Sequence, residues 1–175
     1  MILARSVQRD LPMNILSRQS QRLLQLGVAL LLFSSFEGFV IPYFAAPRLG
    51  LSAHTLSALQ SVLLLALGLA WTRLNLGDVA SRVAFSLLVY STFAILAAYV
   101  LGAFWGAGIE TMPMAAGTAH GTSIEESVIK VVGYSSAPTG IVSFALILWG
   151  LRTPAAARST FSGGARSSDH SGGPS

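Results

Sequence analysis

The stretch RLGLSAHTLSALQSVLLLALGLAW, residues 48–71, decides the fold of this chain. It is long and apolar enough for a membrane helix, yet it carries His54, Ser57, Gln60 and Ser61 in its first turns. Hydrocarbon offers no hydrogen-bond partners, so polar side chains at membrane depth usually face a bundle interior, a cavity or a cofactor. The spacing places His54, Ser57 and Ser61 on one helix face, with Gln60 to one side.

Two interpretations of His54 follow from this pattern alone. The histidine is either an interfacial or packing residue, which is the more common case, or a ligand that faces a cofactor or substrate. The residues of this stretch leave both interpretations open.

The composition of the whole chain also indicates a membrane protein. Of its 175 residues, 53% are hydrophobic and only 10% are charged, with a mean hydropathy of +0.64. A soluble domain of this size would lack the charged surface that keeps such domains dispersed. The formal net charge of +4 is small and scattered, which argues against a nucleic-acid partner. Because the chain has no cysteine, disulfides, thiolate metal sites and cysteine nucleophiles are excluded.

Four apolar runs predict an all-α membrane protein, a bundle of four transmembrane helices. Each run has about the 20 residues that a span requires. The runs cover residues 23–45, 52–71, 83–105 and 127–151. Residues 1–22 form a basic arm, residues 23–152 the transmembrane domain, and residues 153–175 a tail of Ala, Ser, Gly and Arg that is expected to be disordered.

The distribution of basic residues predicts the orientation of the four helices. Four spans place both termini and the link between the second and third helices on one side. That side holds nine arginines, whereas the other holds only Arg48 and Lys130. The positive-inside rule therefore puts both termini in the cytoplasm and His54 near the outer end of its helix. The loop of about 20 residues after Trp105 is either a lid over a site or a mobile connection.

Glu37 lies inside the first predicted span, where a carboxylate is costly. One interpretation is structural: a neutral glutamic acid bonded within the bundle, or an ion pair with Lys130. The other is functional, as a proton relay or a substrate contact. A single membrane glutamate in the first helix is also a feature of small multidrug exporters, so a proton-coupled small-molecule exporter that uses Glu37 is an alternative function.

Several kinds of site are excluded by the absence of their motifs. The sequence has no glycine-rich phosphate loop, no dinucleotide fingerprint, no HExxH and no zinc-type pairing of His and Cys. A quinone-reducing cytochrome that binds haem between two membrane histidines is disfavoured, because only His54 is suitably placed. His120 lies in the long loop.

The segment PRLGLSAH, residues 47–54, and the apolar helix that follows it resemble the bacterial hydroxylaminobenzene mutases. The similarity runs from about Asn14 to Arg152. It implies a multi-pass isomerase of the inner (cell) membrane that converts hydroxylaminobenzene to 2-aminophenol during nitrobenzene degradation. An aromatic hydroxylamine and the lipid bilayer are then the expected partners, and neither NAD nor flavin is expected, since the reaction has no net redox change.

The chain is more distantly similar to the styrene oxide isomerases, whose second helix has Ala-His followed six positions later by Asn, with a downstream Tyr. The matching positions here are Ala53-His54, Gln60 and Tyr99. The resemblance implies that His54 binds the iron of haem b between subunits of a homo-oligomer, a trimer in that family. Tyr99 and Gln60 would contact the substrate, and Gln60 departs from the family's Asn.

That similarity also implies a chemical role for the iron. Ferric iron would act as a Lewis acid on the hydroxylamine oxygen, while Tyr99 and Gln60 hold the substrate and Glu37 serves as a further catalytic candidate. Four aromatic residues are expected to form an apolar wall of the pocket: Phe36, Phe39, Phe93 and Trp105.

Overall fold

The computed structural model describes residues 15–118 and 120–152, and these residues form helices and connecting turns without any strand. Four helices are long: α1 (Ile15–Val40), α2 (Pro47–Ala70), α3 (Asp78–Trp105) and α5 (Ser123–Gly150). The short ones are η1 (Ile41–Tyr43), η2 (Trp71–Arg73) and α4 (Pro113–Ala116). Each long helix has the length and hydropathy of a membrane span, so the expected all-α membrane fold is confirmed.

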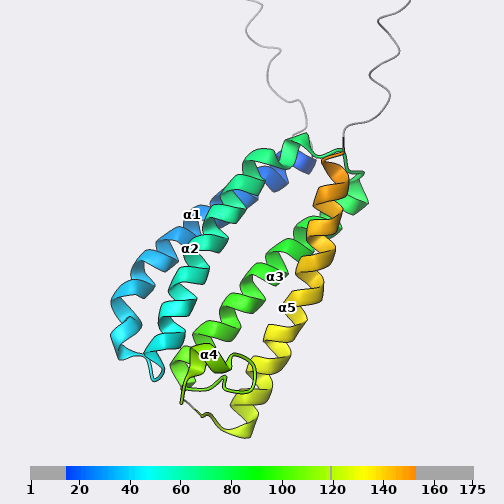
Figure 1. The fold of residues 1–175 in the computed structure, drawn as a ribbon. Helices are drawn as coiled ribbons and strands as arrows, with labels where there is room; N and C mark the ends of the chain where they lie inside the picture. The colour runs from blue at the N-terminus through cyan, green and yellow to red at the C-terminus, as the bar shows by residue number, and fades with distance from the viewer. Residues whose placement is uncertain (1–14, 119, 153–175) are drawn as a thin grey trace, which may run out of the picture.

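The four long helices are arranged as two hairpins (Figure 1). α1 packs along α2, α3 packs along α5, and contact between α2 and α3 joins the two hairpins. α1 and α3 touch at few points, and within the described residues no extended contact links α1 with α5. The helices therefore form an open bundle.

Glycines allow the two helices of the first hairpin to approach closely. A Cβ added to Gly27 would lie 2.8 Å from the side chain of Leu65, and one added to Gly68 would lie 3.0 Å from that of Leu24. Small residues at such contacts are the usual way in which membrane helices gain close packing. This approach brings the polar side chains of α1 and α2 within hydrogen-bond distance.

α1 begins at Ile15, eight residues before the apolar run that predicted it. The added turns contain Arg18 and Arg22, because arginine is a good helix former and its long side chain reaches the aqueous interface. Beside them lies a buried network in which Gln19 Oε1 accepts hydrogen bonds from Trp71 Nε1 at 3.0 Å and from the Ser81 hydroxyl at 2.5 Å. This network ties α1 to the start of α3.

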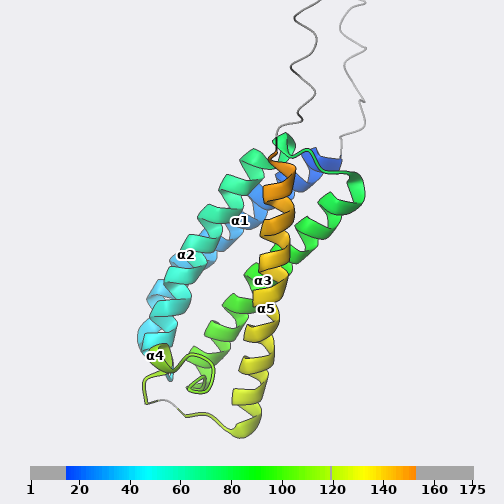
Figure 2. The same ribbon diagram turned by 45° about the vertical axis from the view of Figure 1, so that its right-hand side comes forward.

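The connection between α3 and α5 contains α4, which lies against α2 at the opposite end of the molecule (Figure 2). Glu126 of α5 is buried and accepts hydrogen bonds from four backbone N–H groups of this connection. They belong to Gly108, Ile109, Glu110 and Gly121. One carboxylate thus holds the connection in a defined conformation beside the start of α2.

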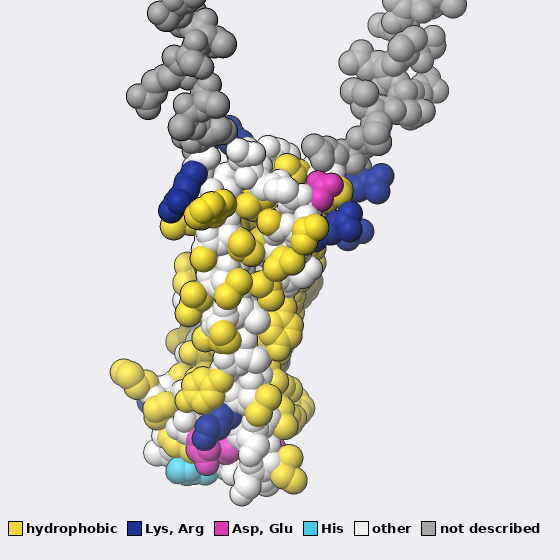
Figure 3. Space-filling model, turned by 90° about the vertical axis from the view of Figure 1, so that its right-hand side faces the viewer, with side chains coloured by type: hydrophobic (Ala, Val, Ile, Leu, Met, Phe, Trp, Pro, Cys, Tyr) yellow, Lys and Arg dark blue, Asp and Glu magenta, His cyan; other side chains and the backbone are white. Residues whose placement is uncertain are grey.

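Charged side chains gather at the two ends of the molecule, and hydrophobic ones cover the length between them (Figure 3). The end where α1 begins and α5 ends carries five arginines of the described residues, whereas the α4 end carries two basic residues. The uneven distribution of basic residues, from which the orientation of the helices in the membrane was predicted, is therefore present in the structure. The cytoplasmic location of the arginine-rich end stays a prediction, and the arm before Ile15 and the tail after Arg152 lie outside the described residues.

Candidate active site

His54 projects from α2 onto the backbone of α1. Its Nδ1 lies 2.9 Å from the carbonyl oxygen of Ser34, and the Ser34 hydroxyl donates to the carbonyl of His54 at 3.2 Å. A backbone carbonyl only accepts hydrogen bonds, so Nδ1 carries a proton, and the neutral tautomer that fits this contact has its lone pair on Nε2. A neutral imidazole held in this way is the arrangement that histidine ligands of metals commonly adopt.

The carboxyl group of Glu37 lies at the same contact between α1 and α2. Glu37 is buried, and its Oε2 accepts a hydrogen bond of 3.1 Å from Ser57, whose hydroxyl is also 2.9 Å from the carbonyl oxygen of His54. Its other oxygen, Oε1, is buried and has no hydrogen-bond partner among the described residues. Of the interpretations of Glu37, the ion pair with Lys130 is wrong, because Lys130 pairs with Glu110 at 3.3 Å.

Tyr99 belongs to α3 and lies against a different face of α2 from the one that carries His54. It lines a groove of about 410 Å³ together with residues of α2: Leu51, Ser52, Thr55, Leu56 and Leu59. At 100° per residue, the mean direction of these residues is about 130° around the helix from His54. The Tyr99 hydroxyl makes no hydrogen bond within the described residues. One chain therefore places His54 with Glu37, and Tyr99 apart from both.

Gln60 has a buried side-chain oxygen, Oε1, for which the described residues supply no donor. A buried acceptor without a partner costs free energy and is uncommon in folded proteins. Ser61, one residue further on, is fully buried as well, yet its hydroxyl is satisfied by the Ala58 carbonyl of its own helix at 2.7 Å. The free oxygen therefore distinguishes Gln60 from its polar neighbour.

The four aromatic residues expected to line the pocket do not form one wall. Phe36 and Phe39 are exposed on the outer surface of α1, at 69% and 79%. Trp105 packs against the small core around Ala98 and Ile129. Phe36 and Phe39 thus face outward, whereas Trp105 faces other helices. The positions of the aromatic residues along the sequence do not reveal this difference.

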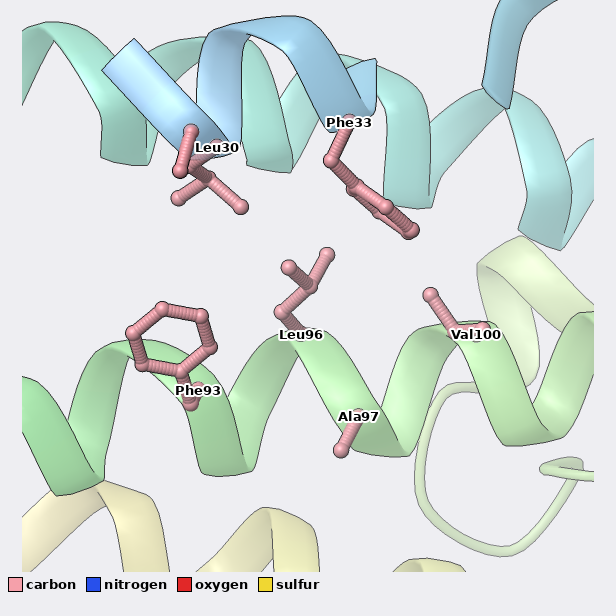
Figure 4. Close-up of a pocket in the computed structure, with 7 residues that line it drawn as sticks. Leu30, Phe33, Phe93, Leu96, Ala97 and Val100 are labelled. Carbon is pink, nitrogen blue, oxygen red and sulfur yellow. The ribbon is translucent and has the colours of Figure 1, made fainter. Parts of the chain in front are cut away.

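Phe93 of the expected wall does line a cleft, but with residues that were not anticipated. The cleft lies between α1 and α3, has a volume of about 330 Å³ and is almost wholly apolar. Figure 4 shows Phe33 and Leu30 of α1 facing Phe93 and Leu96 of α3 across it.

Ser34 is the residue of the site that the sequence alone did not single out. Its position three residues before Glu37 puts the two on one face of α1, a signal available from helical spacing. The described residues contain no group of three or more His, Cys, Asp or Glu side chains that could hold a metal ion, and His120 is exposed in the loop. A metal bound at His54 would have one ligand from this chain.

A model of the styrene oxide isomerase family matches residues 19–152, which include His54, Gln60, Glu37 and Tyr99. The chain belongs to the styrene oxide isomerase family. It is an isomerase, as the curated relatives of the family are named mutases.

Two proteins from Ectopseudomonas oleovorans are similar to this chain. Hydroxylaminobenzene mutase HabB is 46% identical over 141 residues, which cover 81% of this chain and 86% of the relative. Hydroxylaminobenzene mutase HabA is 32% identical over 125 residues, covering 71% of this chain and 93% of the relative. The resemblance stated from the sequence is thereby confirmed. No solved structure matches the chain.

Proposed function

We propose that this isomerase is a hydroxylaminobenzene mutase, which converts hydroxylaminobenzene to 2-aminophenol in the cell membrane. The identity of 46% to HabB over most of both chains is the observation that carries the proposal. The apolar surroundings of the site suit an aryl hydroxylamine, and a water-poor pocket limits attack of water on a cationic intermediate.

The reaction is an isomerisation in which atoms and electrons balance within the substrate. The N–O bond breaks, a C–O bond forms at the ortho carbon, and the proton lost from that carbon is balanced by a proton gained at nitrogen. Neither a nicotinamide nor a flavin is required. The enzyme has to weaken the N–O bond, hold the ring and move a proton.

The residues around His54 fit a haem b. With Nδ1 bonded to the Ser34 carbonyl, Nε2 of His54 would hold the haem iron. Gly38 leaves room beside the ring, since a Cβ there would lie 3.4 Å from His54 Cε1. When bound, ferric haem supplies a Lewis acid for the hydroxylamine oxygen.

The side chains of this isomerase would bind the substrate and transfer the proton. Gln60 Oε1, a buried acceptor without a donor, is suited to accept an N–H or O–H bond from the substrate. The Tyr99 phenol would donate a hydrogen bond to the departing oxygen or to the nitrogen. Glu37, whose Oε1 is free, would carry the proton that passes between carbon and nitrogen.

A pocket that contains both His54 and Tyr99 is best completed between two copies of the chain. Within one chain Tyr99 of α3 lies against a face of α2 that His54 does not share, whereas a ring of copies would bring one face of a protomer to another face of its neighbour. We therefore include a homo-oligomer, a trimer by family resemblance, with cytoplasmic termini in the proposal. Co-expression of H54A and Y99F chains tests it: mixed oligomers regain activity when the site is shared between chains, and stay inactive when it lies within one.

The decisive experiment has two independent readouts on the detergent-purified protein. Oxidised and dithionite-reduced absorption spectra are expected to show a Soret band that His54→Ala removes and the matched loop variant His120→Ala retains. Conversion of hydroxylaminobenzene to 2-aminophenol, followed by chromatography, is expected to fall by about a hundredfold or more in His54→Ala. Full activity with no Soret band in the wild-type protein would refute the haem and leave the mutase standing. Inactivity of a haem-loaded wild-type protein toward hydroxylaminobenzene would refute the substrate.

A further inference from the structure

The end of the bundle opposite α4 has a concavity that the isomerase site does not use. It has a volume of about 410 Å³ and lies between the first turns of α1 and α3. Three arginines line it: Arg18 and Arg22 of α1 and Arg82 of α3, together with Ile15, Gln19, Phe85 and Ser86. Three cations that converge from two helices on one hollow favour an anionic ligand.

No carboxylate of the described residues neutralises these arginines. The ion pair found within residues 15–118 and 120–152 joins Lys130 to Glu110 at the other end of the molecule. Asp78 precedes Arg82 by one helical turn, but no ion pair of 4.0 Å or less joins them. Within the part of the chain that the structure describes, no acidic side chain therefore competes with a ligand for these guanidinium groups.

Gln19 adds a polar group whose orientation is fixed. Its Oε1 is occupied by Trp71 and Ser81 in the buried network, which identifies the oxygen and the nitrogen of the amide. The remaining N–H₂ group makes no hydrogen bond to the described residues, and Gln19 lines the concavity. A fixed amide donor next to three arginines makes a site built for oxygen acceptors.

The concavity and the apolar cleft of Figure 4 are two separate hollows that lie along one seam between α1 and α3. On α1, Arg18, Arg22, Ala29 and Phe33 follow the spacing of a single helix face, as Arg82, Ser86, Phe93 and Ala97 do on α3. The cleft begins seven residues beyond Arg22, about 10 Å deeper along the helix. A charged site near the helix ends and an apolar groove deeper along the helices therefore lie on the same side of the molecule.

We propose that this seam binds one anionic phospholipid, with its phosphate on Arg18, Arg22 and Arg82 and an acyl chain in the cleft lined by Leu30, Phe33 and Phe93. Basic pockets between membrane helices are the expected sites for acidic headgroups. A soluble anion would bind the arginines but would leave the apolar cleft empty. The lipid fills a seam in which α1 and α3 make few direct contacts, and so links the two hairpins.

The test uses the full chain in detergent, with phosphatidylglycerol and phosphatidylcholine of identical acyl chains, native mass spectrometry for bound lipid and thermal unfolding for stability. We expect the wild-type protein to retain about one phosphatidylglycerol per chain in preference to phosphatidylcholine, and to gain thermal stability from it. Arg22→Gln/Arg82→Gln is expected to lose about 25-fold in affinity, since each basic group near an anionic surface contributes about fivefold.

Arg73→Gln/Arg152→Gln is the matched control, because it removes the same charge from the same end without touching the concavity. It should keep the lipid, and Arg22→Lys/Arg82→Lys should keep the preference for phosphatidylglycerol with weaker binding. Equal loss in the control, or equal binding of phosphatidylcholine, would overturn the proposal. Inorganic phosphate that stabilises the wild-type protein as much as phosphatidylglycerol would also overturn it, by assigning the arginines to a free anion.

Discussion

The imidazole Nδ1 of His54 lies 2.9 Å from the carbonyl oxygen of Ser34, so a backbone atom of α1 fixes the tautomer of a side chain on α2. The acceptor is the main chain, and its position depends on the helix path and hardly on the Ser34 side chain. The neighbouring Gly38 leaves room for the ring on the same helix face.

The first prediction follows from this geometry. Ser34→Ala should retain mutase activity within a few-fold and keep the Soret band, because the carbonyl acceptor remains. Gly38→Ala should also be tolerated, since its Cβ would sit 3.4 Å from the ring, whereas Gly38→Leu should displace the imidazole. Visible spectra and turnover of the three variants measure this, and an unaffected Gly38→Leu protein would contradict it.

The second prediction compares two serines on one face of α2. Ser57→Ala removes the donor to Glu37 and leaves both carboxyl oxygens without a partner, at a cost of about 1–3 kcal/mol and with loss of activity. Ser61→Ala should be nearly neutral, because its hydroxyl bonds only a carbonyl of its own helix. Both serines are fully buried, so they form a matched pair for thermal unfolding and turnover. Equal effects would disprove a special role of Ser57.

Gln60 gives the third prediction, in which stability and activity change in opposite directions. Gln60→Leu removes a buried acceptor without a partner and should raise the melting temperature of the substrate-free protein. The same change should raise KM by about tenfold, because the substrate loses its acceptor. Gln25→Leu, on the exposed surface of α1, is the control. A destabilised Gln60→Leu protein would show that the amide is satisfied in the native state.

Tyr99→Phe is the fourth test. Loss of a hydrogen bond made in the transition state should lower kcat by about a hundredfold while haem content is unchanged. Tyr90→Phe is the matched control, since the Tyr90 hydroxyl bonds Ser135 at 2.8 Å between α3 and α5 and should affect stability only. Normal kcat in Tyr99→Phe would remove this residue from the mechanism.

The fifth prediction concerns the loop carboxylate. Glu126→Gln should destabilise the protein by about 1–3 kcal/mol, because the amide N–H₂ cannot accept the backbone bonds that the two carboxylate oxygens share. It should also expose residues 106–122 to proteases. Glu125→Gln, which keeps the capping box with Thr122, should change neither the melting temperature nor the cleavage pattern.

The sequence predicted the four spans because hydrocarbon imposes length and apolarity on each helix, whatever its neighbours. It placed His54 and Ser57 on one face by spacing, which the shared contact with α1 confirms. The ion pair of Glu37 with Lys130, one of its two structural interpretations of Glu37, was wrong: both residues lie toward the α4 end of the bundle, and sequence does not tell which helices touch. The separation of Tyr99 from His54 and the scatter of the aromatic residues depend on helix rotation, which is set by packing.

The division into two hairpins has a consequence for how the protein is made. In the first hairpin, Ser34 and Glu37 are paired with His54 and Ser57; in the second, Ser91 donates to Ser136 and Ser143 to the carbonyl of Ala84. Each of these hydrogen bonds thus joins the two helices of one hairpin. A nascent chain can release the first hairpin into the bilayer with its interhelical hydrogen bonds already made, while the ribosome is still translating the second.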